Sequence, residues 1–315
     1  MVFIAGETLQ VYFLGTAGAL PTPQRNPPCF LIRRGADTLL FDCGEGAQQQ
    51  MMRVRTGFTI DAVFITHWHA DHFLGLFGLM QTLSFMGRDE PLTIYGPEWV
   101  DEFVAAVYHL SKNHLRFPLV ARKLHHGDQV RFEGYHVRAF RTVHGIASLG
   151  YILAEDDRPG RFHRERAIEL GVPAGPLFGR LQRGEEVRIA AGGEERIIRP
   201  GDVLGEPRPG RKIVYTGDTR PGCEGWKEWG CQADLLLHDA TFDDDELDRA
   251  QEVYHSTAGE AGSVAEELGA ATLALVHISS RYTTTANHIQ HAKEHFKGEV
   301  IAPDDLWLLE LPYRG

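Results

Sequence analysis

Four potential metal ligands lie within six residues of the chain. His67, His69, Asp71 and His72 directly follow the apolar segment 61–65 and precede a helical pattern. Imidazole and carboxylate groups together suit zinc. Structural zinc sites are usually closed and rich in cysteine, and this segment has none, so the pattern favours a catalytic metal site. A solvated polar loop is the alternative, but four such groups rarely gather by chance where a strand ends.

Three later segments repeat the order of an apolar strand followed by a ligand. His144 follows 140–143, Asp218 follows 213–217, and His277 follows 273–276. Functional groups of α/β proteins gather where strands end and loops begin. Each of these residues alone is more often structural. Together with the first cluster, they are expected to converge on one site.

Seven ligands are too many for one zinc ion with an open position. They fit two ions about 3.5–4 Å apart, the arrangement that hydrolyses phosphoesters. We assign His67, His69 and His144 to one ion and Asp71, His72 and His277 to the other, with the carboxylate of Asp218 bridging both. Water between two such cations is acidified, which suits hydrolysis near neutral pH.

The elements that position these side chains are short β-branched strands alternating with helical patterns. Strands are expected near 11–13, 29–32, 38–41, 62–65, 92–95, 137–142, 150–154, 212–215, 235–237, 273–276 and 306–309. Helices are expected over 73–84, 97–110, 256–268 and 284–296, where Pro97 suits a first helical turn. This alternation predicts an α/β fold in layers, with helices covering sheets.

One stretch differs from the rest. Residues 156–210 contain a Gly/Pro-rich run at 171–176 and little strand periodicity before Val187, and arginines dominate the first half. We therefore expect one catalytic domain spanning 1–315 that carries an arm inserted at 156–210.

Composition limits the class of protein. The 315 residues are 43% hydrophobic and carry a net charge of -11, which excludes a disordered chain and a nucleic-acid binder with a wholly basic surface, but not a local basic patch. No apolar run reaches membrane-spanning length and no signal peptide is evident, so a cytoplasmic protein without membrane contact is expected. The four cysteines form no C-x-x-C pair, which excludes a zinc ribbon.

The ligand pattern resembles the metallo-β-lactamase superfamily, and further segments resemble ribonuclease Z, the tRNA 3′-processing endonuclease family. These segments are 21–26 with Asn26, Phe41-Asp-Cys-Gly-Glu-Gly46, Tyr215-Thr-Gly-Asp-Thr-Arg-Pro221, His238-Asp-Ala-Thr-Phe242, His255-Ser-Thr257 and His277-Ile-Ser-Ser-Arg-Tyr282. The resemblance runs from about Val11 to Pro312 and includes the insertion, with its Gly175-Pro176 element.

The resemblance implies an αββα sandwich with a flexible arm that binds tRNA. It implies a zinc-dependent endoribonuclease, with two Zn²⁺ per subunit, that removes the 3′ trailer of precursor tRNA after the discriminator nucleotide. The products would be a 3′-hydroxyl on the tRNA and a 5′-phosphate on the trailer. It also implies a homodimer in which one subunit's arm serves the other's active site; no protein partner of another kind is expected.

The resemblance also implies roles for individual residues. Asp71 would position or deprotonate the attacking water, and His255 would protonate the leaving 3′-oxygen while Asp239 keeps its imidazole charged. An N-terminal helix position beside a Ser256-Thr257 cap is the alternative for His255. The residues expected to contact substrate are Arg25, Asn26, Arg161, Arg164, Gly175, Pro176, Thr257 and Arg281.

Two positions depart from the family pattern. Pro23 stands where a lysine is usual in a loop associated with sensing the CCA end, and Asp239 stands where glutamate is usual.

Three rival functions stay open: a hydrolase of the same fold acting on a small thioester, lactone or other phosphodiester, a degenerate RNA-binding module, and a di-iron redox protein. The complete ligand set disfavours the second. The chain is too short for the flavin domain that usually accompanies the third.

Overall fold

The computed structural model describes residues 8–112, 115–191 and 194–314. The chain divides into two compact units, one formed by the residues up to 154 together with those from 211, and the other by residues 155–210. We describe each unit by itself and call them the body and the arm. In the parts described, no helix is long and apolar enough to span a membrane.

Two seven-stranded sheets form the centre of the body. The first has the order β18 (Trp307–Glu310), β1 (Leu9–Gly15), β3 (Cys29–Arg34), β4 (Asp37–Phe41), β5 (Ala62–Phe64), β6 (Leu92–Gly96) and β7 (Leu119–Lys123). The second has the order β17 (Glu299–Ile301), β15 (Thr272–Val276), β14 (Leu235–Asp239), β13 (Lys212–Tyr215), β10 (Leu149–Glu155), β9 (Tyr135–Arg141) and β8 (Gln129–Phe132). Strands β4 to β7 are parallel, as are β13, β14, β15 and β17.

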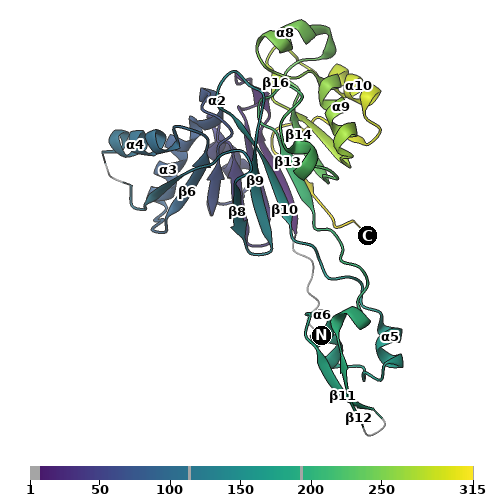
Figure 1. The fold of residues 1–315 in the computed structure, drawn as a ribbon. Helices are drawn as coiled ribbons and strands as arrows, with labels where there is room; N and C mark the ends of the chain where they lie inside the picture. Colours follow the sequence, from purple (N-terminus) through teal and green to yellow (C-terminus); the bar gives the residue numbers. More distant parts are fainter. Residues whose placement is uncertain (1–7, 113–114, 192–193, 315) are drawn as a thin grey trace. The chain divides into compact units, whose positions relative to one another are not determined.

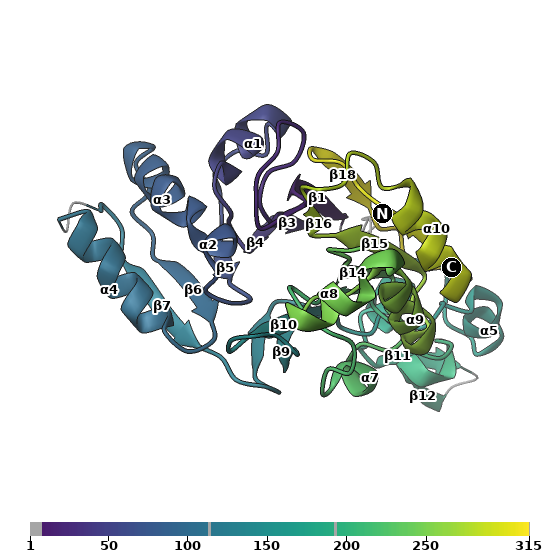
Figure 2. The ribbon, with the colours of Figure 1, turned by 90° about the horizontal axis from the view of Figure 1, so that it is seen from above.

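Helices cover the outer face of each sheet (Figure 2). The first sheet carries α1 (Ala47–Val54), α2 (Ala70–Phe73), α3 (Gly75–Phe85) and α4 (Val100–Leu110). The second carries α7 (Trp226–Trp229), α9 (Ala258–Leu268) and α10 (Ala286–His295), while α8 (Leu247–Glu252) comes between β14 and α9 in the chain. One apolar cluster fills the space between the sheets, and two others lie under the helices. This is the expected layered α/β sandwich.

The helix boundaries differ from the sequence-based expectation, most clearly at three places. Pro97 precedes α4 because Trp99, at φ 78°, turns the chain there and the helix begins at Val100. The helix expected over 73–84 is two helices, α2 and α3, joined at Leu74. The helix expected from residue 256 begins at Ala258, after an N-cap at Thr257.

The arm folds around its own apolar cluster (Figure 1). It contains α5 (Arg164–Glu169), α6 (Pro176–Gln182), the hairpin β11 (Val187–Ala191) and β12 (Glu194–Ile198), and one turn of 3-10 helix, η1 (Pro200–Asp202). Its two ends run antiparallel, since Arg158 and Arg208 exchange backbone hydrogen bonds of 2.7 and 2.9 Å. An insertion with adjacent ends and its own core interrupts the body without replacing any of its strands.

Candidate metal centre

All seven expected ligands lie where strands of the two sheets end. His67 and His69 follow β5, and Asp71 and His72 lie in α2 immediately after them. The other three follow β9, β13 and β15 of the second sheet; these are His144, Asp218 and His277. Because parallel strands end at one edge of a sheet, distant parts of the chain meet there.

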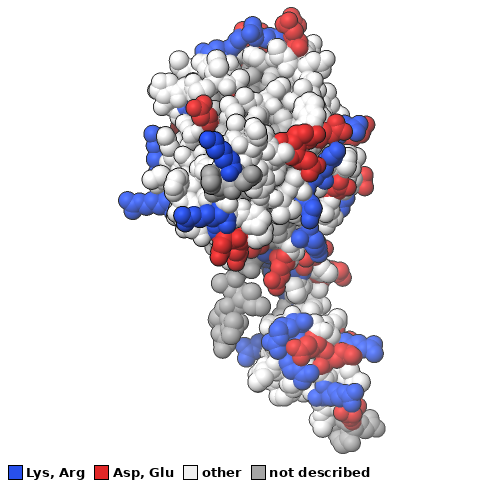
Figure 3. Space-filling model, turned by 90° about the vertical axis from the view of Figure 1, so that its left-hand side faces the viewer, with Lys and Arg blue, Asp and Glu red and all other residues white. Residues whose placement is uncertain are grey.

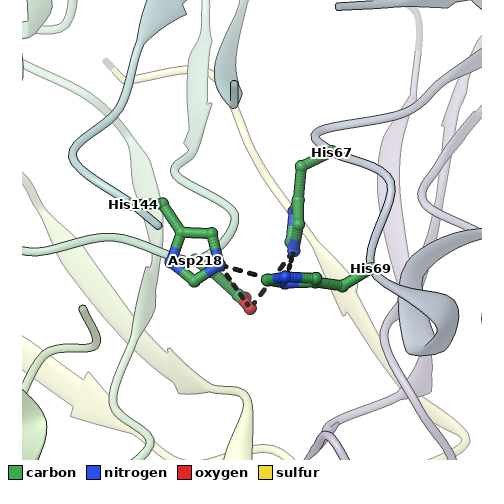
Figure 4. Close-up of side chains that lie close together, drawn as sticks. All are labelled: His67, His69, His144 and Asp218. Carbon is green, nitrogen blue, oxygen red and sulfur yellow. Dashed lines mark hydrogen bonds and ion pairs between the residues drawn. The ribbon is translucent and has the colours of Figure 1, made fainter. Parts of the chain in front are cut away.

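The first group contains His67, His69, His144 and Asp218, whose ligand atoms all lie within 4.8 Å of one another (Figure 4). The Nδ1 atom of His69 is 3.0 Å from Nε2 of His67 and 3.1 Å from Nε2 of His144. In a tetrahedral zinc site with Zn–N bonds of about 2.0–2.1 Å, ligand atoms are about 3.3 Å apart. The spacing of these nitrogen atoms therefore fits one zinc ion.

The second group contains Asp71, His72 and His277. Oδ2 of Asp71 is 3.5 Å from Nε2 of His72 and 3.4 Å from Nε2 of His277. Asp218 contacts both groups: its Oδ2 is 3.5 Å from Nε2 of His67 and 3.3 Å from Nε2 of His72. Among the residues described, Oδ1 of Asp218 and Nε2 of His72 are buried without a hydrogen-bond partner. Such atoms, aimed into one space, fit the assigned ligands of two cations with Asp218 between them.

Asp42 is a buried partner of His72 to which the sequence alone assigned no role. Its fully buried carboxylate accepts hydrogen bonds from Nδ1 of His72 at 2.7 Å, the Tyr215 hydroxyl at 2.6 Å and the backbone N–H of Thr66 at 2.8 Å. Because Nδ1 of His72 donates to Asp42, Nε2 is the atom that can bind a metal. The signal was present, since Asp42 directly follows an apolar strand as the other ligands do.

Other ligands are oriented in the same way. Nδ1 of His144 donates to the carbonyl of Tyr254 at 3.0 Å, which leaves Nε2 facing the cluster. The hydroxyl of Thr241 donates to Oδ1 of Asp239 at 2.7 Å. Its oxygen atom therefore accepts from Nδ1 of His277, which lies 2.7 Å away. These contacts fix the ring orientation before any metal binds.

Strained backbone gathers around this centre. Asp42, Tyr254 and His277 have φ values of 53°, 61° and 62°, a region that residues other than glycine rarely adopt. Gly217 has φ 60°, and a Cβ there would lie 2.8 Å from the Thr66 side chain. The turn that presents Asp218 therefore requires glycine immediately before it.

Burial and neighbouring charges shift the pKa values of the expected ligands in different directions. Burial opposes ionisation of Asp218, but the imidazoles of His277 and His72 outweigh it and hold the pKa of Asp218 well below its usual value. Burial lowers the pKa of His67 well below its usual value, and His72 adds to this effect. Burial also lowers the pKa of His144. Burial opposes protonation of His72, but the carboxylates of Asp218 and Asp42 outweigh it and hold the pKa of His72 well above its usual value. Imidazole binds a metal in its neutral form, so metal binding at Nε2 of His72 releases a proton.

His255 and Asp239 lie beside the ligands as a bonded pair. Nδ1 of His255 is 2.8 Å from Oδ2 of Asp239, and its Nε2 is 4.0 Å from Oδ2 of Asp218. Burial disfavours the imidazolium, but the charges of Asp239 and Asp218 outweigh it and raise the pKa of His255 to about 9. Asp239 also accepts from the N–H of Thr219 at 2.9 Å, so its oxygens are engaged by protein groups. This arrangement is compatible with the predicted role of His255 as a proton donor, which stays a prediction.

Two predicted substrate residues, Arg25 and Asn26, lie in the loop before β3. Arg25 binds the body itself, donating to Oγ1 of Thr16 at 2.6 Å, the carbonyl of Pro303 at 2.7 Å and Oδ1 of Asp304 at 2.7 Å. Asn26 lines a pocket of about 480 Å³ beside the start of α1. The structure thus gives Arg25 a role in holding this loop, and its substrate contact stays a prediction.

Two others lie on the second-sheet side. Thr257 is the N-cap of α9 and forms a reciprocal capping box with Glu260. Arg281 lies over the ring of Phe242 and forms a 3.0 Å ion pair with Glu246.

The remaining four lie in the arm. Arg164 begins α5, Gly175 is the N-cap of α6 and Pro176 is its first residue. The side chains of Arg161 and Arg164 make no hydrogen bond or ion pair with any described residue.

Comparison with known proteins identifies related sequences. A family model described as "Anti-Pycsar protein Apyc1" matches residues 9–158, and one described as "Beta-lactamase superfamily domain" matches residues 194–278. A ribonuclease Z of Methanosarcina acetivorans is 51% identical over 307 residues, which is 97% of this chain and 99% of that protein.

Solved structures show the same fold. Human tRNase Z, short form, superposes with a TM-score of 0.69 at 28% identity, covering 96% of this chain and 99% of that one. YhfI from Bacillus subtilis, described as a metallo-β-lactamase fold protein, superposes with a TM-score of 0.70 at 19% identity, covering 96% and 99%. The expected metallo-β-lactamase fold is confirmed.

Proposed function

The chain belongs to the ribonuclease Z family, and from this premise we propose that it removes the 3′ trailer of precursor tRNA with two zinc ions at the centre described above. It is a hydrolytic endoribonuclease. The observation that carries the proposal is the position of Asp218 between two ligand groups, with His255 beside them. We propose cleavage after the discriminator nucleotide.

The donor set fits two zinc ions. His67, His69 and His144 would hold one and Asp71, His72 and His277 the other, with Asp218 shared. When bound, two such ions lower the pKa of a water and neutralise charge on the phosphoryl oxygens.

The other steps belong to the protein's own groups. Asp71, whose Oδ2 faces His277, would orient the attacking water, and His255, bonded to Asp239, would protonate the leaving 3′-oxygen. Protonation matters because a ribose alkoxide is a poor leaving group. The products would carry a 3′-hydroxyl on the tRNA and a 5′-phosphate on the trailer.

The arm is the proposed tRNA-binding element. Arg161 and Arg164 are free of protein partners in the described chain, so their guanidinium groups are accessible to phosphates.

A homodimer is also part of the proposal, supported by exposed apolar side chains on α1 and at the end of α3, namely Met52, Phe85 and Met86. We place the enzyme in the cytoplasm with its substrate.

The test is cleavage of a 3′-extended precursor tRNA, with and without an encoded CCA. Asp218→Asn is the control variant, because it keeps the shape of the shared ligand and removes its charge. We expect cleavage after the discriminator by the zinc-loaded wild type and its loss in the variant. Cleavage of the CCA-containing precursor would connect the absence of the usual lysine at Pro23 with relaxed discrimination.

The rival proposal is a hydrolase of a small thioester, lactone or other phosphodiester. It predicts that the metal-loaded wild type leaves both RNAs intact while hydrolysing such a compound. That result would keep the fold and the metal centre and reject the ribonuclease activity.

A further inference from the structure

We propose that Arg220 is a positioning residue for His255, acting with Glu260 as a clamp on the main chain of the segment 255–257. The inference rests on the proposed function of His255 as the acid that protonates the leaving oxygen. Arg220 lies two residues after Asp218, in the loop that follows β13.

The guanidinium group of Arg220 joins two parts of the chain that are far apart in sequence. Its Nη1 donates to the carbonyl oxygen of His255 at 2.7 Å and to Oε2 of Glu260 at 2.6 Å, and its Nη2 contacts Oε1 of Glu260. The two side chains are only 15% and 22% exposed. A two-point Arg–carboxylate pair that is largely shielded from water fixes geometry as well as contributing energy.

Glu260 extends the clamp along the segment. Its Oε2 accepts from the backbone N–H of Thr257 at 3.0 Å, while the Thr257 hydroxyl accepts from the backbone N–H of Glu260. The carboxylate thus links Arg220 to the first turn of α9 on one side and to the turn after His255 on the other. The backbone of His255 is held by a side-chain pair and not by secondary structure alone.

The loop that carries Arg220 also carries Asp218 and contacts the segment that precedes His144. The backbone N–H of Arg220 donates to the carbonyl of Val143, the residue before His144, at 2.8 Å. Oγ of Ser256 donates to the carbonyl of Thr219 at 2.5 Å. The clamp therefore sets the position of His255 relative to ligands on the same loop and on its neighbour. Its backbone contacts do not depend on the identity of the Arg220 side chain.

A positioning role makes a specific kinetic prediction. If the clamp acts through protonation of the leaving group, its removal affects a ribose leaving group and spares one that departs as a stable anion. We expect Arg220→Gln and Glu260→Gln to lower kcat on precursor tRNA by about 10–100-fold, the range for groups that orient active-site residues, with KM unchanged. Hydrolysis of bis(p-nitrophenyl) phosphate should stay at the wild-type rate.

Three further variants complete the experiment. Arg220→Lys should be intermediate, because one ammonium group cannot span both acceptors as the fork does. Arg220→Gln combined with His255→Ala should be no slower than His255→Ala alone, since both act on one step. Glu267→Gln is the matched control, because it makes the same change on α9 in an ion pair with Lys227 and should leave kcat unchanged. Zinc content of each variant is measured alongside.

Several results would overturn the inference. If Arg220→Gln raises KM for precursor tRNA and leaves kcat unchanged, Arg220 binds a phosphate of the substrate and does not position His255. Equal slowing on both substrates, or loss of zinc, would make the clamp a support of the whole centre. His255→Ala separates this inference from the proposed function. If that variant slows both substrates equally, His255 is not the acid and both claims fail; if it slows precursor tRNA alone and Arg220→Gln does not, only the clamp fails.

Discussion

At the scale of single residues, three of the five histidines among the expected ligands are held so that Nε2 faces the cluster. Asp42, the Tyr254 carbonyl and Thr241 each engage the Nδ1 atom of a different ligand. Burial favours the neutral form of His67, neighbouring imidazoles favour the ionised form of Asp218, and the carboxylates of Asp218 and Asp42 raise the pKa of His72. The ligands are thus oriented at the expense of strained backbone at Asp42, Tyr254 and His277.

Asp42→Asn tests this orientation. The change keeps the size of the side chain but removes the charge that faces Nδ1 of His72, so we expect zinc affinity to fall by about 10–100-fold. The measurement is competition with a zinc chelator, and thermal unfolding of the metal-free protein separates an affinity effect from a folding defect. Asp89→Asn, the same change at an exposed position, is the control. Unchanged zinc affinity in Asp42→Asn would contradict the role of Asp42.

At the scale of elements, the sequence predicts the buried strands well because both of their faces carry apolar side chains. It also brings out the seven expected ligands, because each closely follows such a strand, and the structure brings their side chains together; their binding of a metal stays a prediction. The edge strands β7 and β8 were not predicted, since half of their residues face solvent and include Arg122, Lys123 and Arg131. Asp42 was missed because its partners, Tyr215 and His72, come from other elements, and only the folded chain brings them together.

Thr257 has two candidate roles, and one of them belongs to the helix that it begins. Thr257→Ala removes the capping side chain of α9 and should lower the free energy of unfolding by about 1 kcal/mol, whereas Thr257→Ser should restore it. Thr285→Ala is the matched control, because Thr285 is the N-cap of α10 without a side-chain cap bond. Urea unfolding measures the stabilities. A raised KM for precursor tRNA in Thr257→Ala but not in Thr257→Ser would add the predicted substrate contact to the capping role.

At the scale of the whole molecule, an acidic chain must bind a polyanion. The arm has no net positive charge that would attract RNA, since residues 155–210 contain ten arginines and eleven acidic residues. Figure 3 shows the two signs mixed on it. Several arginines are paired within the arm, including Arg166 with Glu169 and Arg180 with Glu185. We therefore expect phosphate binding only from the arginines whose guanidinium groups have no protein partner among the residues described.

The difference between paired and unpaired arginines gives the arm a test that does not depend on its placement. Arg161→Gln with Arg164→Gln removes two guanidinium groups that have no partner among the described residues, so precursor tRNA should bind more weakly. The slope of log affinity against log salt should fall by about one for each phosphate that the variant no longer neutralises. Arg180→Gln with Arg183→Gln makes the same change in charge, but both arginines pair with Glu185 and should affect binding less.

Binding is measured across a range of salt concentrations with the Asp218→Asn variant, which should not cleave the RNA. Hydrolysis of bis(p-nitrophenyl) phosphate by cleavage-competent versions should be unchanged in both pairs, because this small substrate carries no RNA for the arm to hold. Equal salt slopes in the two pairs would mean that the arm binds RNA by overall charge or not at all, and the assignment of Arg161 and Arg164 would fail.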